Sequence, residues 1–154
     1  MKKKNNKGVV IWVTGLSGSG KSFFAKKIKK FFDKKKISSI LINGDDLRKI
    51  FELNKFDQKN RLNYAYSYAL LCKKISNQGI NVIIGTIAMF HKIRNWNRKN
   101  INNYYEVYIK TSYDLIKKRN KKKLYLGKIK NVIGKDIKAD LPKKTNFLLL
   151  NDFK

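Results

Sequence analysis

Residues 9–28 read VVIWVTGLSGSGKSFFAKKI and predict a strand, a tight turn and a helix in succession. The apolar run at 9–14 has the length of a strand that is buried on both faces. After the turn, Phe24, Ile28 and Phe31 recur at helical spacing, which predicts a helix over 21–35. The turn, residues 15–22, matches the pattern G-x-x-x-x-G-K-[ST]. In loops with this pattern the backbone N–H groups surround phosphate oxygens. The sequence therefore predicts a nucleoside triphosphate site between the first strand and the first helix.

Each residue type in this turn has a chemical reason. The glycines let backbone N–H groups close around phosphate oxygens without a side-chain clash, and the following helix directs its positive end at the same phosphates. Lys21 can reach the β- and γ-phosphates, and the Ser22 hydroxyl can bind Mg²⁺. We expect Lys21 to be catalytic, Ser22 to be the metal ligand and Mg²⁺ to be the cofactor. The residues expected to bind Mg·ATP are Gly15, Leu16, Ser17, Gly18, Ser19, Gly20, Lys21 and Ser22.

Strand and helix patterns alternate along the rest of the chain. Further strands are expected at 37–43, 80–86, 105–110 and 147–150, and further helices at 44–51, 58–78, 90–101 and 112–123. This alternation predicts an α/β fold of the P-loop NTPase type, a parallel β-sheet with helices on both faces. We expect a single domain over 1–154, with a disordered basic N-terminus at 1–7.

The composition limits the classes of partner. The formal charge of +27 favours an anionic substrate. Its lysines are spread along the chain without the aromatic interleaving of a single-strand binder, so nucleic acid is not the expected partner. A single cysteine, Cys72, excludes a disulfide framework and is expected to be a small core residue. No apolar run approaches the roughly 20 residues that span a bilayer, and we expect a cytoplasmic protein with no membrane partner.

The second predicted strand ends in Asn43-Gly44-Asp45-Asp46-Leu47-Arg48. The carboxyl ends of parallel strands form the binding crevice, so this loop should face the phosphate turn. Asp45 can orient or deprotonate an acceptor hydroxyl, or hold a Mg²⁺-bound water, and Arg48 can bind an anionic acceptor. Asp46 has the simpler role of a cap on the helix that follows.

Together these segments resemble the adenylylsulfate kinase family, which phosphorylates the ribose 3′-hydroxyl of adenosine 5′-phosphosulfate. Residues 15–22 match its G-L-S-G-[SA]-G-K-[ST] loop, and residues 43–48 match its D-G-D-x-x-R motif except for the first Asp. Residues 87–98 parallel I-S-P-Y-R-x-x-R-x-x-x-R, and GKIKNVIGKD parallels G-E-I-K-N-F-T-G. The resemblance, over about residues 8–150, implies a homodimer that uses small nucleotide substrates. It also implies acceptor contacts from Asp45, Arg48, Phe56, Arg61, Ile87 and Val132.

The chain departs from the family pattern around the acceptor. Val132 replaces a Phe that, with Phe56, would enclose the adenine, and Asn120 and Lys123 alter R-D-x-K-G-L-Y before a shortened lid. The pattern T-I-A-M-F…W-N-R also resembles the family's cytidine diphosphoramidate kinase branch. More motifs match the adenylylsulfate kinases, so adenylylsulfate is narrowly favoured as the acceptor. An ATP-binding pseudo-enzyme and a basic nucleic-acid-binding module are the remaining alternatives.

Residues at the start of the expected helix at 90–101 complete the predictions. His91 is expected to be a surface polar residue, because no partner is evident in the sequence. Arg94 and Arg98 lie at i and i+4, so we expect either that both reach the crevice or that both are solvated.

Overall fold

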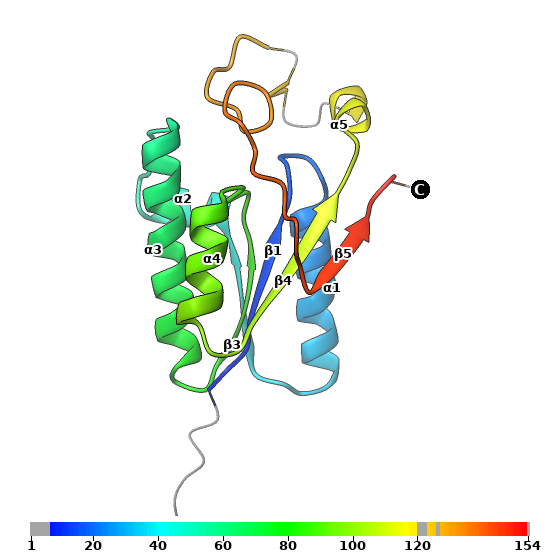
Figure 1. The fold of residues 1–154 in the computed structure, drawn as a ribbon. Coiled ribbons are helices and arrows are strands. Elements are labelled where there is room, and N and C mark those ends of the chain that lie inside the picture. The colour runs from blue at the N-terminus through cyan, green and yellow to red at the C-terminus, as the bar shows by residue number, and fades with distance from the viewer. Residues whose placement is uncertain (1–6, 120–122, 126, 154) are drawn as a thin grey trace, which may run out of the picture.

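The computed structural model describes residues 7–119, 123–125 and 127–153. Five parallel strands form one sheet in the order β2-β3-β1-β4-β5 (Figure 1). The strands are β1 (Val10–Thr14), β2 (Ser39–Asn43), β3 (Asn81–Gly85), β4 (Tyr104–Lys110) and β5 (Phe147–Leu150). The helices are α1 (Lys21–Lys34), α2 (Gly44–Ile50), α3 (Gln58–Ser76), α4 (His91–Asn100) and α5 (Tyr113–Arg119).

Helices cover both faces of the sheet, as the sequence predicts. Figure 1 shows α3 and α4 on one face and α1 on the other. Alternate strand residues point to opposite faces, so Trp12 and Ile84 join the core beneath α3 and α4, whereas Val13 and Ile83 pack with Ala25 of α1. The predicted α/β fold with a parallel sheet is confirmed.

The central strand β1 positions the phosphate turn. It pairs with β3 on one side and with β4 on the other, and Val10, Trp12 and Val13 have no exposed surface. Because parallel strands share a direction, the carboxyl ends of β1, β2 and β3 lie at the same edge of the sheet. That edge carries residues 15–22, residues 43–48 and the segment that follows β3.

Two features of α3 follow from local residues, its start and one of its core positions. Asp57 caps α3 by accepting from the backbone N–H of Asn60 at 3.0 Å, and hydrogen bonds from Asn60 lower the pKa of this carboxyl. Cys72 of α3 is fully buried, and burial raises the pKa of its thiol to about 12, which fits the expected small core residue.

Some of the predictions extend beyond the described residues. Of the helix expected over 112–123, the structure describes α5 (Tyr113–Arg119), and residues 120–122 lie outside the described part of the chain. The prediction for Asn120 and most of the predicted disordered N-terminus fall outside the described residues. Lys7 is described, and its carbonyl accepts from the Asn103 side chain at 3.0 Å. None of the helices in the described part of the chain combines the length and apolar character needed to cross a membrane.

Candidate active site

The phosphate turn joins the end of β1 to α1. Gly18 (φ +80°) and Gly20 (φ +99°) lie in the left-handed region that favours glycine. A Cβ at Gly20 would lie 2.6 Å from the side-chain amide of Asn151, which would have to move aside. Lys21 is buried, and its Nζ donates to the Leu16 carbonyl at 2.6 Å, across the turn. The turn therefore places its lysine inside the loop that the pattern predicts.

A cavity of about 540 Å³ lies beside this turn. Lys21 and Ser22 line it from the start of α1, and Asp45 and Arg48 line it from α2. Its full lining is Gly18, Gly20, Lys21, Ser22, Phe23, Asn43, Gly44, Asp45, Arg48, Gly85, Thr86, Ile87, Arg119, Asn151 and Phe153. The volume suits a nucleotide, because small-molecule sites are commonly of about 300–1,000 Å³.

Three residues that line this first cavity come from the C-terminal part of the chain, which the sequence did not assign to the nucleotide site. The Arg119 guanidinium lies 3.6 Å from the centre of the Phe153 ring, and Asn151 donates to the Ser19 carbonyl at 2.8 Å. Arg119 occupies the Arg position of the segment that parallels R-D-x-K-G-L-Y, and this match could have identified it. Asn151 and Phe153 follow β5, whose short apolar sequence carries no comparable signal.

A second cavity, of about 430 Å³, adjoins the first. All six residues that the sequence assigned to the acceptor line it, although they come from separate parts of the chain. Its lining is Ser17, Asp45, Arg48, Phe56, Arg61, Ile87, Leu124, Ile129, Lys130, Val132 and Ile133. Asp45, Arg48 and Ile87 line both cavities, so a carboxylate and a guanidinium lie where the two spaces meet.

The Asp45 carboxylate forms an ion pair with Arg48, one turn along α2. Both side chains are partly exposed, which leaves them accessible from the cavities. The expected capping role of Asp46 is wrong: Asn43 is the N-cap of α2, and its side-chain amide donates to Asp46 at 3.0 Å. The strand passes directly into the helix here, which shifts the cap toward the strand.

Arg61 joins two walls of the second cavity. Its Nε donates to the Phe56 carbonyl at 2.6 Å, and its Nη2 donates to the Asn131 carbonyl at 2.8 Å. Its guanidinium also lies 5.3 Å from the centre of the Phe56 ring. Burial, and to a lesser degree the neighbouring Arg48, lower the pKa of Arg61. Arg61 therefore connects the start of α3 with the segment that carries Val132.

The two faces expected around a base are unequal. The Phe56 side chain is 42% exposed, whereas Val132 is only 4% exposed and packs with Ile116 and Tyr125. Among the described residues that line this cavity, Phe56 is the only aromatic one. The cavity thus offers one aromatic face for stacking.

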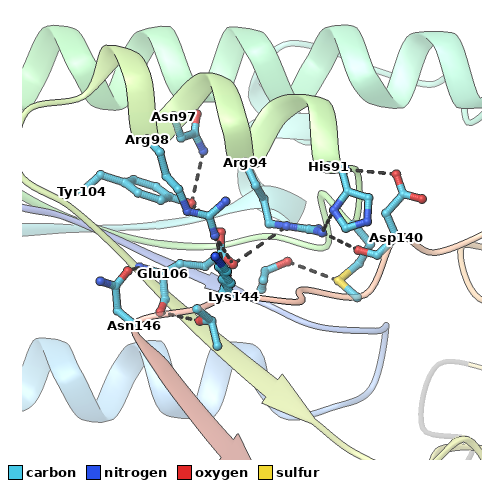
Figure 2. A network of polar contacts seen from close by, with 12 residues as sticks. His91, Arg94, Asn97, Arg98, Tyr104, Glu106, Asp140, Lys144 and Asn146 are labelled. Atoms are coloured by element: carbon cyan, nitrogen blue, oxygen red, sulfur yellow. Dashed lines mark hydrogen bonds and ion pairs between the residues drawn. The ribbon is translucent and has the colours of Figure 1, made fainter.

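The prediction for Arg94 and Arg98 is wrong. Neither lines the two cavities described above, and they are not both solvated. Figure 2 shows both pointing from α4 toward Glu106 of β4. Arg98 Nη2 lies 3.1 Å from Glu106 Oε1. Arg94 Nε lies 3.8 Å from the same oxygen. The two arginines attach α4 to the sheet.

His91 belongs to this network, so its expected role as a simple surface residue is also wrong. Its Nδ1 lies 2.7 Å from Arg94 Nη2, and its backbone N–H donates to the Asp140 carboxylate at 3.0 Å. Glu106, which the sequence did not single out, has no exposed surface. Burial raises the pKa of Glu106, although Arg98 and Arg94 oppose that shift.

The comparisons with known proteins agree with this architecture. The model of the adenylylsulphate kinase family matches residues 7–150. The chain belongs to the adenylylsulfate kinase family. It is 39% identical over 143 residues to the cytidine diphosphoramidate kinase of Campylobacter jejuni serotype O:2, covering 90% of this chain and 84% of that protein.

Other relatives include adenylylsulfate kinases. The chain is 31% identical over 153 residues to the adenylylsulfate kinase of Pseudomonas aeruginosa, covering 95% of this chain and 78% of that protein. The adenylylsulfate kinase of Mycobacterium tuberculosis, whose structure holds AMPPNP and APS, superposes with a TM-score of 0.88 at 27% identity. The match covers 96% of this chain and 91% of that one. The family assignment makes this chain a phosphotransferase that acts on a hydroxyl group.

Proposed function

We propose that this chain transfers the γ-phosphate of Mg·ATP to the 3′-hydroxyl of cytidine diphosphoramidate. The observation that carries the proposal is the meeting of two cavities at Asp45 and Arg48. One cavity contains a phosphate turn, and the other contains an aromatic face and two arginines. A donor in the first and an acceptor in the second would bring the two reacting groups to the same carboxylate.

The phosphate turn would act on the donor mainly through positioning and electrostatics. Phosphoryl transfer spreads negative charge over the γ-phosphoryl oxygens, and a lysine and backbone N–H groups stabilise that charge. Lys21 would exchange its present bond to the Leu16 carbonyl for a phosphate oxygen. The exposed Ser22 hydroxyl fits Mg²⁺, a cation that binds oxygen ligands together with substrate phosphates. Mg²⁺ would neutralise charge on the β- and γ-phosphates.

The acceptor would be held by groups on α2 and α3. Asp45 would accept or orient the proton of the attacking hydroxyl, as a carboxylate does in general base catalysis. Arg48 would leave Asp45 to bind the acceptor's anionic diphosphate-like group, which its planar guanidinium fits. The base would stack on the exposed Phe56 ring.

Two observations favour cytidine over adenosine as the acceptor. Identity to the Campylobacter jejuni enzyme is 39%, against 31% for the Pseudomonas aeruginosa adenylylsulfate kinase. Val132 supplies no second aromatic face, and each stacking face contributes about 1–3 kcal/mol to base binding. A single-ring base loses less when one face is absent. The proposed acceptor is therefore the cytidine compound, whereas the sequence motifs alone narrowly favour adenylylsulfate.

Adenylylsulfate remains the second candidate acceptor. The family model covers residues 7–150, and residues 15–22 match the family's loop throughout. Both candidates present a ribose 3′-hydroxyl and an anionic group to the same residues. They differ in the base that faces Phe56 and Val132.

ADP release by the purified chain distinguishes the candidates. Mg·ATP would be supplied with cytidine diphosphoramidate in one reaction and with adenosine 5′-phosphosulfate in another. We expect turnover with the cytidine compound and little with the adenosine compound. The reverse preference would overturn the assigned base, and silence with both while ATP still binds would favour the pseudo-enzyme.

A further inference from the structure

Tyr68 of α3 has a hydroxyl that nothing in the proposed mechanism uses. The side chain is 4% exposed, and its Oη has no hydrogen-bond partner among the described residues. A buried hydroxyl without a partner destabilises a fold, so such a group in a protein calls for an explanation. A ligand atom that reaches the hydroxyl is one such explanation.

Tyr68 lines a recess of about 20 Å³ next to the acceptor cavity. The residues shared by the recess and the acceptor cavity are Arg48, Phe56, Arg61, Ile87 and Ile133. A space needs roughly 10–15 Å³ to hold one water molecule. The recess can therefore receive one polar atom that projects from the acceptor, but not a ring.

The polar side chains around the recess favour a ligand atom that accepts hydrogen bonds. Burial raises the pKa of Tyr68 even though Arg48 opposes the shift, so the phenol keeps its proton at neutral pH and can donate it. Arg48 also lines the recess and carries only donors. Arg61 is already bonded to the Phe56 and Asn131 carbonyls. Thr86 and Tyr64 also line the recess, and their hydroxyls can donate or accept. A carbonyl oxygen can accept from Tyr68 and Arg48 together, whereas an amino group could use only the lone pairs of hydroxyl oxygens.

We propose that Tyr68 determines base specificity by donating a hydrogen bond to a carbonyl oxygen that projects from a pyrimidine stacked on Phe56. In cytosine that atom is the 2-carbonyl oxygen. Adenine has no carbonyl: its exocyclic group is an amino donor, and its acceptor nitrogens lie within the rings. The inference rests on the proposed function, because it names the class of base that the same acceptor cavity selects.

Tyr68→Phe tests this role by removing a single oxygen. We expect kcat/KM for cytidine diphosphoramidate to fall about 10-fold or more, chiefly through KM, with the KM for ATP unchanged. The melting temperature of the nucleotide-free protein should stay the same or rise, since the lost hydroxyl has no partner among the described residues. Tyr66→Phe is the matched control, because Tyr66 lies on the same helix and packs edge-on against Trp96 with ring centroids 5.9 Å apart.

An acceptor analogue gives a second readout. Replacing the 2-carbonyl oxygen of the cytidine acceptor with sulfur provides a larger and weaker hydrogen-bond acceptor. The native chain and Tyr66→Phe should prefer the oxygen compound by about 10-fold, and Tyr68→Phe should lose most of that preference. Equal preference in all three proteins, or acceptor kinetics in Tyr68→Phe equal to native, would overturn the role of Tyr68 while leaving the proposed function intact. If the native chain did not turn over the cytidine acceptor, the proposed acceptor would fail, and this inference with it.

Discussion

Asp45 is the residue on which the proposed chemistry depends most, because it lines both the donor and the acceptor cavities. Asp45→Asn keeps the shape of the side chain but removes its ability to take a proton. General base catalysis contributes about 10²–10⁴-fold, so we expect kcat to fall within that range while the Kd for ATP changes less than about twofold. Steady-state ADP release and direct nucleotide titration measure the two quantities.

Asp46→Asn is the control for that experiment. Asp46 is the next residue of α2, is exposed and accepts only from Asn43 among the hydrogen bonds described for it. Its variant should keep near-native kcat. An unchanged kcat in Asp45→Asn would remove this carboxylate from the chemical step.

Lys21 makes a separate contribution at the residue scale. Lys21→Ala should lower kcat at least about 10²–10³-fold, because a preorganised donor to the developing negative charge is lost. The far-ultraviolet circular dichroism of the variant should match that of the native protein. Lys26→Ala changes an exposed lysine of the same helix and should leave turnover unchanged. Substantial activity in Lys21→Ala would argue against phosphate binding by the turn.

The elements meet at a buried charge network whose stability depends on pH. Glu106 of β4 joins Arg94 and Arg98 of α4 (Figure 2). Burial raises the pKa of Glu106 above its ordinary value of 4.5, so the folded protein binds this proton more tightly than the unfolded chain. The contribution of Glu106 to the free energy of unfolding is therefore greatest below pH 4.5 and declines as pH rises through the raised pKa.

Urea unfolding at a series of pH values measures this decline. The free energy of unfolding of the native protein minus that of Glu106→Gln should fall as pH rises from about 4 to about 7. Glu52→Gln changes an exposed glutamate and should give a nearly constant difference over the same range. A difference that grew with pH for Glu106→Gln would mean that the two arginines outweigh the cost of burial.

Pairing between elements marks a limit of prediction from the sequence. The apolar runs and helical spacings locate the five strands and five helices, because each reflects which side of its own element is buried. The i, i+4 spacing of Arg94 and Arg98 says that they share a face, but not which element packs against it. Glu106 lies between Tyr105 and Val107 of β4, and its two arginine partners come from a different element.

The cavities show the same limit at the scale of the whole molecule. Motifs and the family resemblance identified the phosphate turn and six residues that line the acceptor cavity. Arg119, Asn151 and Phe153 reach the donor cavity from α5 and from the segment after β5, far along the chain from the turn. The sequence did not single out Tyr68, which lies in a regular helical pattern. Helical periodicity predicts which side chains are buried, but not whether a buried hydroxyl has a hydrogen-bond partner. The expected homodimer and cytoplasmic location stay predictions.

The net charge of the whole chain should affect substrate capture. With a formal charge of +27, the protein attracts anionic nucleotides over a distance set by ionic screening, about 30 Å at 0.01 M salt and about 8 Å at 0.15 M. We expect kcat/KM for both nucleotides to fall several-fold over this range while kcat changes little. Steady-state kinetics at constant Mg²⁺ measure the effect. A salt-independent kcat/KM would show that the surface charge has no part in capture.

The most direct test of phosphoryl transfer to a nucleotide hydroxyl follows the γ-phosphate itself. ATP labelled in its γ-phosphate would be incubated with the purified chain, Mg²⁺ and the cytidine acceptor, and the products would be separated by anion exchange and assigned by phosphorus NMR. We predict that the label appears in the acceptor as a 3′-phosphomonoester, and that this product is lost in Lys21→Ala and strongly reduced in Asp45→Asn. Label found only in inorganic phosphate, or retained in ATP that remains bound, would contradict the account.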